Sequence, residues 1–450
     1  MRHRKLRLGL VAAFTMVYAL AIFAQTARAD YQPTTSDVVG VGSDTVQFAG
    51  DFLADGDFLA DPGYNVGKKN KLISFDAVPD VDARLPYGNL GVGPTCAPGT
   101  GATEGTANQT TTHTESASKP VCSYNATIVF RAGGFGAQRP NGSGAGVKLL
   151  VQRDTTSPFL VDFARASDTA CNILKTSGTC PQPALTAGID SVQIGTDPLR
   201  ILKASTSNAP AAGLSNAELA DIYNCLTTTW NALPGNSGGS TATIIPVLPQ
   251  VGSGTRSSFL SAIGVTTPGS CTKTGEENDP TAIYGQGAGT SANVIEPMSI
   301  GRLNMFQGKL SDGTPTTLPS YFRDPSCVAL STNAACAGGN PIAPSVAYFC
   351  PTLPCANAGD SNPQFGIDRP LFIFFRHSDL NSTKKFQGTT SLLNWVRTLL
   401  YNPCDGFVPG TCPDATHGPG GTPFFEALTG QALISAAGII PAYAYTANGP

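Results

Sequence analysis

The sequence predicts an α/β protein with two lobes and mostly parallel sheets. Apolar segments of strand length alternate with segments whose apolar residues recur at helical spacing. The 450 residues exceed the size of one typical domain, so two lobes are expected. Charged residues make up 13% of the chain, and 50 glycines and 35 prolines interrupt it. This composition disfavours a helical bundle or a coiled coil.

Residues 1–29 have the pattern of a secretory signal peptide. Basic residues precede an apolar stretch from Leu8 to Ala24, and Ala27-Arg28-Ala29 provides a small-residue cleavage site. We expect cleavage after Ala29 and a secreted product, extracellular or periplasmic. A membrane anchor is the alternative, but the small residues argue against it, and no later run reaches the ~20 apolar residues of a membrane span.

Removal of the leader leaves 23 basic and 31 acidic residues, so the net charge changes from -3 to -8. A nucleic-acid partner would require a basic stripe, which the sequence lacks. We therefore expect no nucleic-acid partner and no membrane-spanning segment in the mature chain.

The mature chain contains all twelve cysteines. An even number in an exported protein indicates disulfides. Zinc is disfavoured because no C-x-x-C motif occurs and few histidines remain, so we expect no metal. The spacing suggests pairing between sequential neighbours, a hypothesis that the sequence cannot prove: 96–122, 171–180, 225–271, 327–336, 350–355 and 404–412.

The first strand is expected from Ser36 to Val41. Gly42-Ser43-Asp44-Thr45 follows it, and a helical pattern then runs over residues 46–53. A second strand over residues 126–131 leads into a glycine-rich stretch at 133–146, after which apolar patterning resumes.

The clearest helix begins after Ser215, which forms a capping box with Glu218 and has Leu214 as a hydrophobic staple. One face of this helix is apolar, formed by Leu219, Ile222, Tyr223 and Leu226. A buried strand is expected at 369–375 and helices at 392–400 and 424–437. Three polar stretches should be surface insertions: 97–120, 235–243 and 327–366.

The segment from Val247 to Arg256 has the strongest functional pattern. An apolar run ends in Gly-Ser-Gly-Thr, and a helical pattern follows at once. Such a turn directs free backbone N–H groups and the positive end of a helix dipole at one point. Ser253 and Thr255 add hydroxyl donors, so the segment suits a dehydrated anion. A capped helix without a ligand is the alternative.

Four segments together resemble the phosphate-binding proteins that serve ABC transporters, which have the type II periplasmic-binding-protein fold. A fifth stretch, 214–223 followed by Trp230-Asn231, resembles a structural helix of that family. The four segments are Val39 to Thr45, Asn141 to Val147, Val161 to Asp168, and Gly252-Ser253-Gly254-Thr255.

The resemblance implies two α/β lobes joined by a hinge of two crossing strands, with the ligand in the cleft between them. One lobe would contain 31–200 with 368–450, and the other 201–367. It also implies a monomer without a cofactor that captures phosphate or a related oxyanion and delivers it to an ABC permease. The implied ligand-binding residues are Ser43, Thr45, Ser143, Asp168, Ser253, Gly254, Thr255 and Arg256.

Asp168 has the sharpest implied role. A carboxylate beside an anion repels it unless the anion brings a hydrogen to share, so Asp168 would favour phosphate over sulfate. The alternative is that Ser167-Asp168 caps the turn that follows.

The sequence departs from the family at two positions. Pro249 stands where the family has an arginine four residues before the serine of Gly-Ser-Gly-Thr, and Arg256 could compensate. Asp44 stands where the family offers a hydroxyl, and a second buried carboxylate would oppose anion binding by several kcal/mol. A different oxyanion, a neutral polar solute or the loss of transport function therefore stay open.

We do not expect an enzyme. Ser253 lies in Gln-Val-Gly-Ser-Gly, which lacks the first glycine of the G-x-S-x-G nucleophile elbow. The remaining alternative is an extracellular surface or interaction protein that reuses the fold without binding an oxyanion.

Overall fold

The structure is a computed structural model. In the part of the chain that it describes, every helix is too short or too polar to cross a bilayer. The predicted leader and the polar stretch at 97–120 lie outside the described residues, as does most of 327–366. The described residues are 33–57, 59–75, 77, 127–128, 130–132, 137–138, 140–152, 160–174, 188–211, 213–278, 280–283, 286, 289–306, 310–314, 346–348, 365–380, 395–403, 405 and 421–447.

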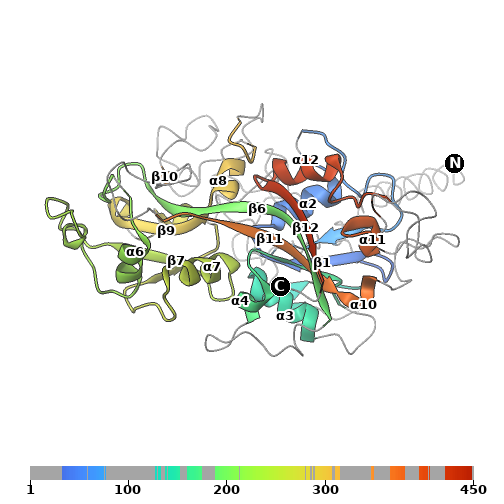
Figure 1. The fold of residues 1–450 in the computed structure, drawn as a ribbon, viewed down its shortest axis with the longest axis horizontal. Coiled ribbons are helices and arrows are strands. Elements are labelled where there is room, and N and C mark those ends of the chain that lie inside the picture. The colour runs from blue at the N-terminus through green and yellow to red at the C-terminus, as the bar shows by residue number, and fades with distance from the viewer. Residues whose placement is uncertain are drawn as a thin grey trace, which may run out of the picture.

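Two lobes share one continuous sheet (Figure 1), with the strand order β2-β1-β5-β11-β6-β9-β7-β8. Within each lobe the strands are parallel: β1 pairs with β2 and β5, and β7 pairs with β8 and β9. The predicted fold class is therefore confirmed. These strands are β1 (Val38–Gly42), β2 (Leu72–Ser74), β5 (Phe163–Ala166), β7 (Ile245–Pro249), β8 (Lys273–Gly275) and β9 (Val294–Ser299).

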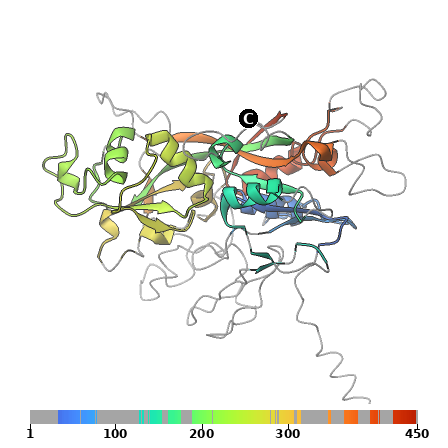
Figure 2. The same cartoon turned by 90° about the horizontal axis from the view of Figure 1, so that it is seen from below.

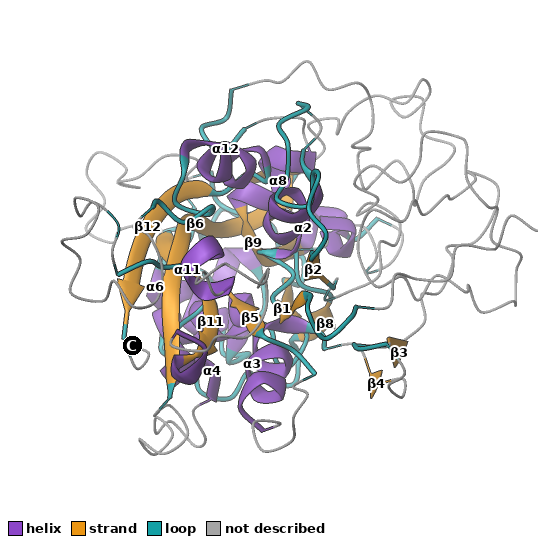
Figure 3. Cartoon of the chain, turned by 90° about the vertical axis from the view of Figure 1, so that its right-hand side faces the viewer, coloured by secondary structure: helices purple, strands orange, loops and turns teal. Residues whose placement is uncertain are grey.

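The lobes are joined by β6 (Ile189–Ala204) and β11 (Ile367–Arg376), which run antiparallel to each other from one lobe into the other. Figure 2 shows the same two bodies from below, with the green and yellow segments in one and the blue and teal segments in the other. β12 (Ile440–Thr446) and β10 (Val346–Tyr348) pair with β6 outside the main strand order. β6, β11 and β12 lie side by side in Figure 3.

The sheet of the first lobe is buried on both faces, which explains the uninterrupted apolar run in β11. Ile373 and Phe375 belong to one core cluster, and Phe372 and Phe374 belong to another. Helices α2 and α12 pack together on the first side, and α3 packs against β5 and α4 on the second. The helices are α2 (Gln47–Asp55), α3 (Gly142–Gln152), α4 (Ala170–Leu174), α10 (His377–Leu380), α11 (Trp395–Leu399) and α12 (Leu428–Ala436); β3 (Thr127–Ile128) and β4 (Ala137–Gln138) form a separate pair.

The second lobe contains the predicted capping box. The Glu218 backbone N–H donates to Ser215 Oγ at 3.3 Å, and the Ser215 N–H donates to Glu218 Oε2 at 2.8 Å. Tyr223, Trp230 and Phe259 form the centre of this lobe's core. The elements are α6 (Asn216–Tyr223), α7 (Gly254–Ile263), α8 (Ile300–Phe306) and the short 3-10 helices η2 (Trp230–Ala232), η3 (Pro280–Ile283) and η4 (Ser291–Asn293).

Two local expectations are corrected. Leu226 is exposed rather than part of the apolar helix face, because α6 ends at Tyr223 and Cys225 adopts a positive φ of 64°. The second glycine-rich loop is the first turn of α3, which begins at Gly142. Glycine is needed there because a Cβ at Gly146 would lie 2.5 Å from the Gly42 Cα.

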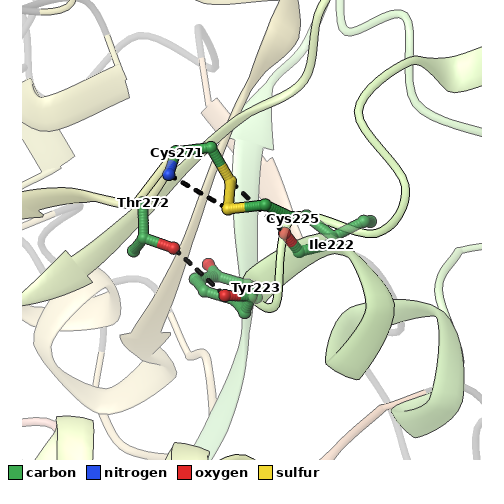
Figure 4. Close-up of a disulfide and its surroundings, with 5 residues drawn as sticks. All are labelled: Ile222, Tyr223, Cys225, Cys271 and Thr272. Carbon is green, nitrogen blue, oxygen red and sulfur yellow. Dashed lines mark hydrogen bonds between the residues drawn. A yellow bond between two sulfur atoms is a disulfide. The ribbon is translucent and has the colours of Figure 1, made fainter. Parts of the chain in front are cut away.

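The disulfide Cys225–Cys271 joins the end of α6 to the segment before β8 (Figure 4), and this pair of the sequential hypothesis is confirmed. Cys171 is also in a disulfide, but the other nine cysteines lie outside the described residues. Thr272 Oγ1 donates to the Tyr223 carbonyl at 3.3 Å beside the bond. The disulfide therefore anchors β8 to the lobe core two residues before the strand begins.

We expect Cys225→Ser with Cys271→Ser to lower the free energy of unfolding by up to about 4 kcal/mol, the chain-entropy value for a closed loop of this length, which spans a sequence separation of 46. Thermal and urea unfolding measure the loss. Thr272→Val removes one hydrogen bond from the same segment, and we expect it to cost about 1 kcal/mol. A double variant no less stable than Thr272→Val would contradict the anchoring role.

Candidate functional site

The predicted glycine and serine turns meet where the lobes touch. The turn after β1, the first turn of α3 and the turn after β5 come from one lobe, and the first turn of α7 comes from the other. Hydrogen bonds join them directly: among others, the Gly144 N–H donates to the Gly252 carbonyl at 2.9 Å, and Gln250 Nε2 donates to Asn141 Oδ1 at 2.7 Å. The cleft between the lobes is thus closed at this point.

Gly254 allows this close approach. A Cβ at this position would lie 2.2 Å from Ser167 Oγ and 2.5 Å from Ser143 Oγ, so a side chain would collide with both serines of the opposite lobe. The two serines bond each other, since the Ser167 N–H donates to Ser143 Oγ at 3.1 Å. The N-terminus of α7 therefore presses against a fixed pair of hydroxyl groups.

A carboxylate oxygen, Oε1 of Glu277, occupies the point on which these turns converge. It accepts from Thr255 Oγ1 at 2.6 Å, from the Thr255 backbone N–H at 3.3 Å and from Thr45 Oγ1 at 3.0 Å. Ser167 Oγ lies 3.5 Å from the same oxygen. Glu277 has 0% of its surface exposed. A buried anion is thus held by hydroxyls from both lobes and by a helix N-terminus, the set of donors expected for an oxyanion.

Glu277 is presented by the turn that follows β8. Its neighbour Asn278 adopts a positive φ of 55°, and its side chain fixes the turn against both lobes. Asn278 Nδ2 donates to Thr45 Oγ1 at 2.9 Å and to Asp44 Oδ2 at 3.4 Å, while Oδ1 accepts from the Ser299 N–H at 3.1 Å. The turn is therefore held in place on either side of the cleft.

Arg369, on the crossing strand β11, brings positive charge to the site. It is buried and donates to Asp197 Oδ2 through Nε at 2.9 Å and through Nη2 at 2.8 Å. Nη2 also donates to Thr45 Oγ1 at 3.1 Å, whereas Nη1 has no hydrogen-bond partner among the described residues. Arg369 therefore supplies a cation that the sequence lacks at Pro249.

The buried Asp44 has a cation beside it. Its Oδ1 lies 3.5 Å from Arg302 Nη2, and the Arg302 guanidinium stacks on the Phe48 ring at 3.9 Å. Opposite charge at this distance offsets much of the desolvation of both groups. The structure thus balances the carboxylate that the sequence places beside the site.

The other predicted site residues have mixed surroundings. Ser43 is fully buried, and its Oγ has no partner among the described residues. Ser253 is the N-cap of α7 and accepts from the Arg256 N–H at 3.1 Å. Arg256 is half-buried and donates to the Pro249 carbonyl at 2.9 Å. Burial lowers the pKa of Arg256, although a guanidinium stays charged at neutral pH.

Asp168 has the capping role that the sequence offered as the alternative to ligand binding. Its Oδ1 accepts from the Thr169 N–H at 2.7 Å and from Asn172 Nδ2 at 3.0 Å, which is the capping role. Its Oδ2 is buried without a hydrogen-bond partner in the described part of the chain. The second oxygen is therefore the one that could accept a hydrogen from a ligand.

A groove of about 600 Å³ runs along the outer side of α7. Its lining includes Gly144 and Ile173 from one lobe and Arg256 and Leu260 from the other. Glu277 is not part of this lining. The groove borders the cleft, but the convergent donors lie inside the closed contact.

Residues 100–308 match the model of the PBP superfamily domain. This part of the chain is similar to a PBP superfamily domain. The resemblance predicted from the sequence is confirmed at this level. The domain match includes Ser143, Asp168, the first turn of α7 and Glu277, whereas Thr45 and Arg369 lie on either side of it.

A comparison with curated proteins finds no match. Several solved structures are similar, among them the following three. One is a protein from Clostridium perfringens described as a putative phosphate ABC transporter substrate-binding protein. It has 14% identity over 68% of this chain and 87% of that chain, with a TM-score of 0.35. A possible phosphate-binding protein from Planctomyces limnophilus has 14% identity over 77% and 84%, with 0.32. An ABC-type phosphate transport receptor from Vibrio cholerae has 18% over 53% and 75%, with 0.30. At these TM-scores the likenesses carry no weight for the ligand.

Glu277, Asn278 and Arg369 were not identified from the sequence as residues of the site. Glu277 lies in the acidic stretch Glu276-Glu277-Asn278-Asp279, which resembles an exposed turn. Arg369 opens an apolar strand, where an arginine is costly to bury without a partner. A charged residue at the start of an apolar strand was the one sequence feature that could have indicated a buried arginine with a partner.

We expect Gly254→Ala to destabilise the closed contact by about 1 to 3 kcal/mol, because the added methyl group overpacks the two serines. The matched control is Gly238→Ala in the same lobe, where an added Cβ meets nothing within 4 Å. Thermal unfolding compares the two variants. Equal melting temperatures would show that the lobes do not meet at Gly254 in solution.

Proposed function

We propose that the mature chain is an exported solute-binding protein that captures phosphate or a related oxyanion between its lobes. One observation carries the proposal: hydroxyl and backbone N–H donors from both lobes surround a single buried anionic oxygen, that of Glu277. The match to the PBP superfamily domain supports the same assignment. The ligand-binding residues proposed from the sequence are kept, and Arg369 is added to them.

The chemistry of the site favours an oxyanion over a neutral solute. The first turn of α7 offers the Thr255 N–H group, which already donates to a carboxylate, and the positive end of the helix dipole. Arg369 is buried, and its Nη1 nitrogen, which could donate a charge-assisted hydrogen bond to an anion, has no hydrogen-bond partner among the described residues. Charge-assisted hydrogen bonds of this kind are about twice as strong as neutral ones.

The wider role follows from the predicted leader and fold. We propose cleavage after Ala29, a monomer with lobes at 31–200 with 368–450 and 201–367, and delivery of the anion to an ABC permease. Binding from both lobes would favour the closed arrangement over an open one. Ser253 caps α7 by accepting from the Arg256 N–H, and we propose a binding role for it rather than catalysis.

A second candidate is an extracellular interaction protein that keeps the fold without binding an oxyanion. The observation that favours it is that Glu277 already satisfies the donors at the centre of the cleft. Binding to a cell-surface partner without any response to small anions would be its signature.

We expect phosphate to raise the melting temperature of the mature, dialysed protein. A ligand at 100 times its dissociation constant adds about 2.7 kcal/mol, which corresponds to about 2 to 4 °C in a protein of this size. Sulfate should give a smaller shift, because Asp168 Oδ2 can only accept a hydrogen. Asp168→Asn should remove this preference, since an amide can also donate.

No shift with either anion, after mass spectrometry has excluded retained ligand, would favour the interaction protein instead. A rise in melting temperature as large with sulfate as with phosphate would be consistent with an oxyanion site. It would contradict the proposal that Asp168 favours phosphate over sulfate.

We expect Arg369→Lys to weaken phosphate binding about 10-fold, which is about 1.4 kcal/mol, because lysine cannot reproduce the planar arrangement of donors. The matched control is Arg131→Lys, which alters another buried arginine paired with an aspartate, Asp162 at 2.6 Å. Isothermal titration gives the affinities and thermal unfolding the stabilities. Equal affinities for the two variants would remove Arg369 from the site.

A further inference from the structure

We infer that Glu277 is an internal ligand: its carboxylate occupies the oxyanion position, and a soluble anion has to displace it. The inference rests on the proposed oxyanion site and names the occupant of that site when no solute is bound. A carboxylate oxygen stands in for the oxygen of a phosphate or sulfate, because both carry negative charge and accept several hydrogen bonds at once.

The first argument is that the donors are already used. Thr255 Oγ1 has one hydrogen, which it gives to Glu277 at 2.6 Å. Thr45 Oγ1 gives its hydrogen to Glu277 and accepts from Asn278 Nδ2 and Arg369 Nη2. Both hydroxyl groups are therefore fully engaged while Glu277 is in place, and a phosphate could not use their hydrogens.

The second argument is charge. Glu277, Asp44 and Asp197 are fully buried, Arg302 pairs with Asp44, and Arg369 pairs with Asp197. A dianion added to three carboxylates and two guanidinium groups in a low-dielectric interior would be repelled. Departure of the Glu277 carboxylate removes one negative charge and frees the donors in the same step.

The third argument is that the backbone segment carrying Glu277 is anchored. The turn that carries it follows a strand of three residues, β8, and the disulfide Cys225–Cys271 anchors the chain two residues before that strand. Glu276, the preceding residue, accepts from Asn141 Nδ2 of the opposite lobe at 2.9 Å. A short anchored segment holds the carboxylate at the site, so a free anion competes with an intramolecular one.

With competition of this kind, the apparent affinity for the anion equals the affinity of the vacated site multiplied by the fraction of molecules in which the site is free. If Glu277 occupies the site in about nine molecules of ten, the wild-type dissociation constant is about 10-fold higher than that of the vacated site. Glu277 would thereby set the anion concentration at which the protein responds.

The test compares the mature wild-type protein with Glu277→Ala, Glu277→Gln and Asp221→Asn. The last variant removes one negative charge from an exposed position on α6, away from the cleft. Phosphate, sulfate and acetate are titrated into each protein by calorimetry and by thermal unfolding. We expect Glu277→Ala to unfold at a lower temperature without added anion, and acetate or phosphate to restore its stability.

We also expect phosphate to bind Glu277→Ala at least 10-fold more tightly than it binds the wild-type protein or Asp221→Asn. Glu277→Gln keeps the volume of the side chain and removes its charge, so it gives the same comparison if the alanine variant does not fold. Glu277→Gln should bind phosphate more tightly than wild type.

Weaker phosphate binding by Glu277→Ala or Glu277→Gln than by wild type would overturn the inference and make Glu277 a contact of the bound solute. The absence of any anion response in the variants would overturn it as well. Rescue of Glu277→Ala by acetate or phosphate without binding to wild type would uphold the internal ligand while the proposed capture function fails. If wild type binds phosphate tightly and the variants bind it equally tightly, the proposed capture function is upheld and the internal ligand is rejected.

Discussion

A buried negative charge at the junction of the lobes is the constraint on which the rest of the structure depends. An ionised carboxylate removed from water is tolerated only where hydrogen-bond donors and opposite charges surround it. For Glu277 these come from the turn after β1, the N-terminus of α7 and, through Thr45, from Arg369 on the crossing strand. These three segments and the turn that carries Glu277 are thus required to meet at one point.

The backbone is adapted to this meeting. Gly254 brings the helix N-terminus against Ser143 and Ser167, and Gly146 lets α3 approach Gly42 at the end of β1. The crossing strands β6 and β11 carry the ion pair between Asp197 and Arg369 into the junction. The disulfide at the end of α6 anchors the segment that carries the acidic turn. Loss of any of these contacts would leave charged or polar groups without partners in the interior.

The same arrangement links the fold to its proposed function. A two-lobed protein that closes on an anion needs donors on both sides of its cleft, and this chain has them. It differs from a simple open receptor in that one of its own carboxylates already satisfies those donors. Closure and ligand binding are therefore separable here, because the lobes can close on an internal group.

The sequence by itself determined the features that depend on neighbouring residues. The capping box at Ser215, the serine cap of α7 and the buried strand at 369–375 all follow from local hydrogen bonding or apolar spacing, and the structure contains each of them. The alternation of strand and helix patterns predicted the α/β fold, and the family resemblance implied its two crossing strands. Helix ends were less accurate, as at Leu226, because a disulfide and a positive φ end α6 early.

Only the tertiary structure decided what occupies the cleft. Glu277 lies 232 residues from Thr45 and 22 from Thr255, and Arg369 lies 324 from Thr45. Nothing in the local pattern of an acidic turn or of a strand end indicates that these side chains meet. Their roles arise from the closing of two lobes over a shared sheet, which brings charge and donors together independently of their separation along the chain.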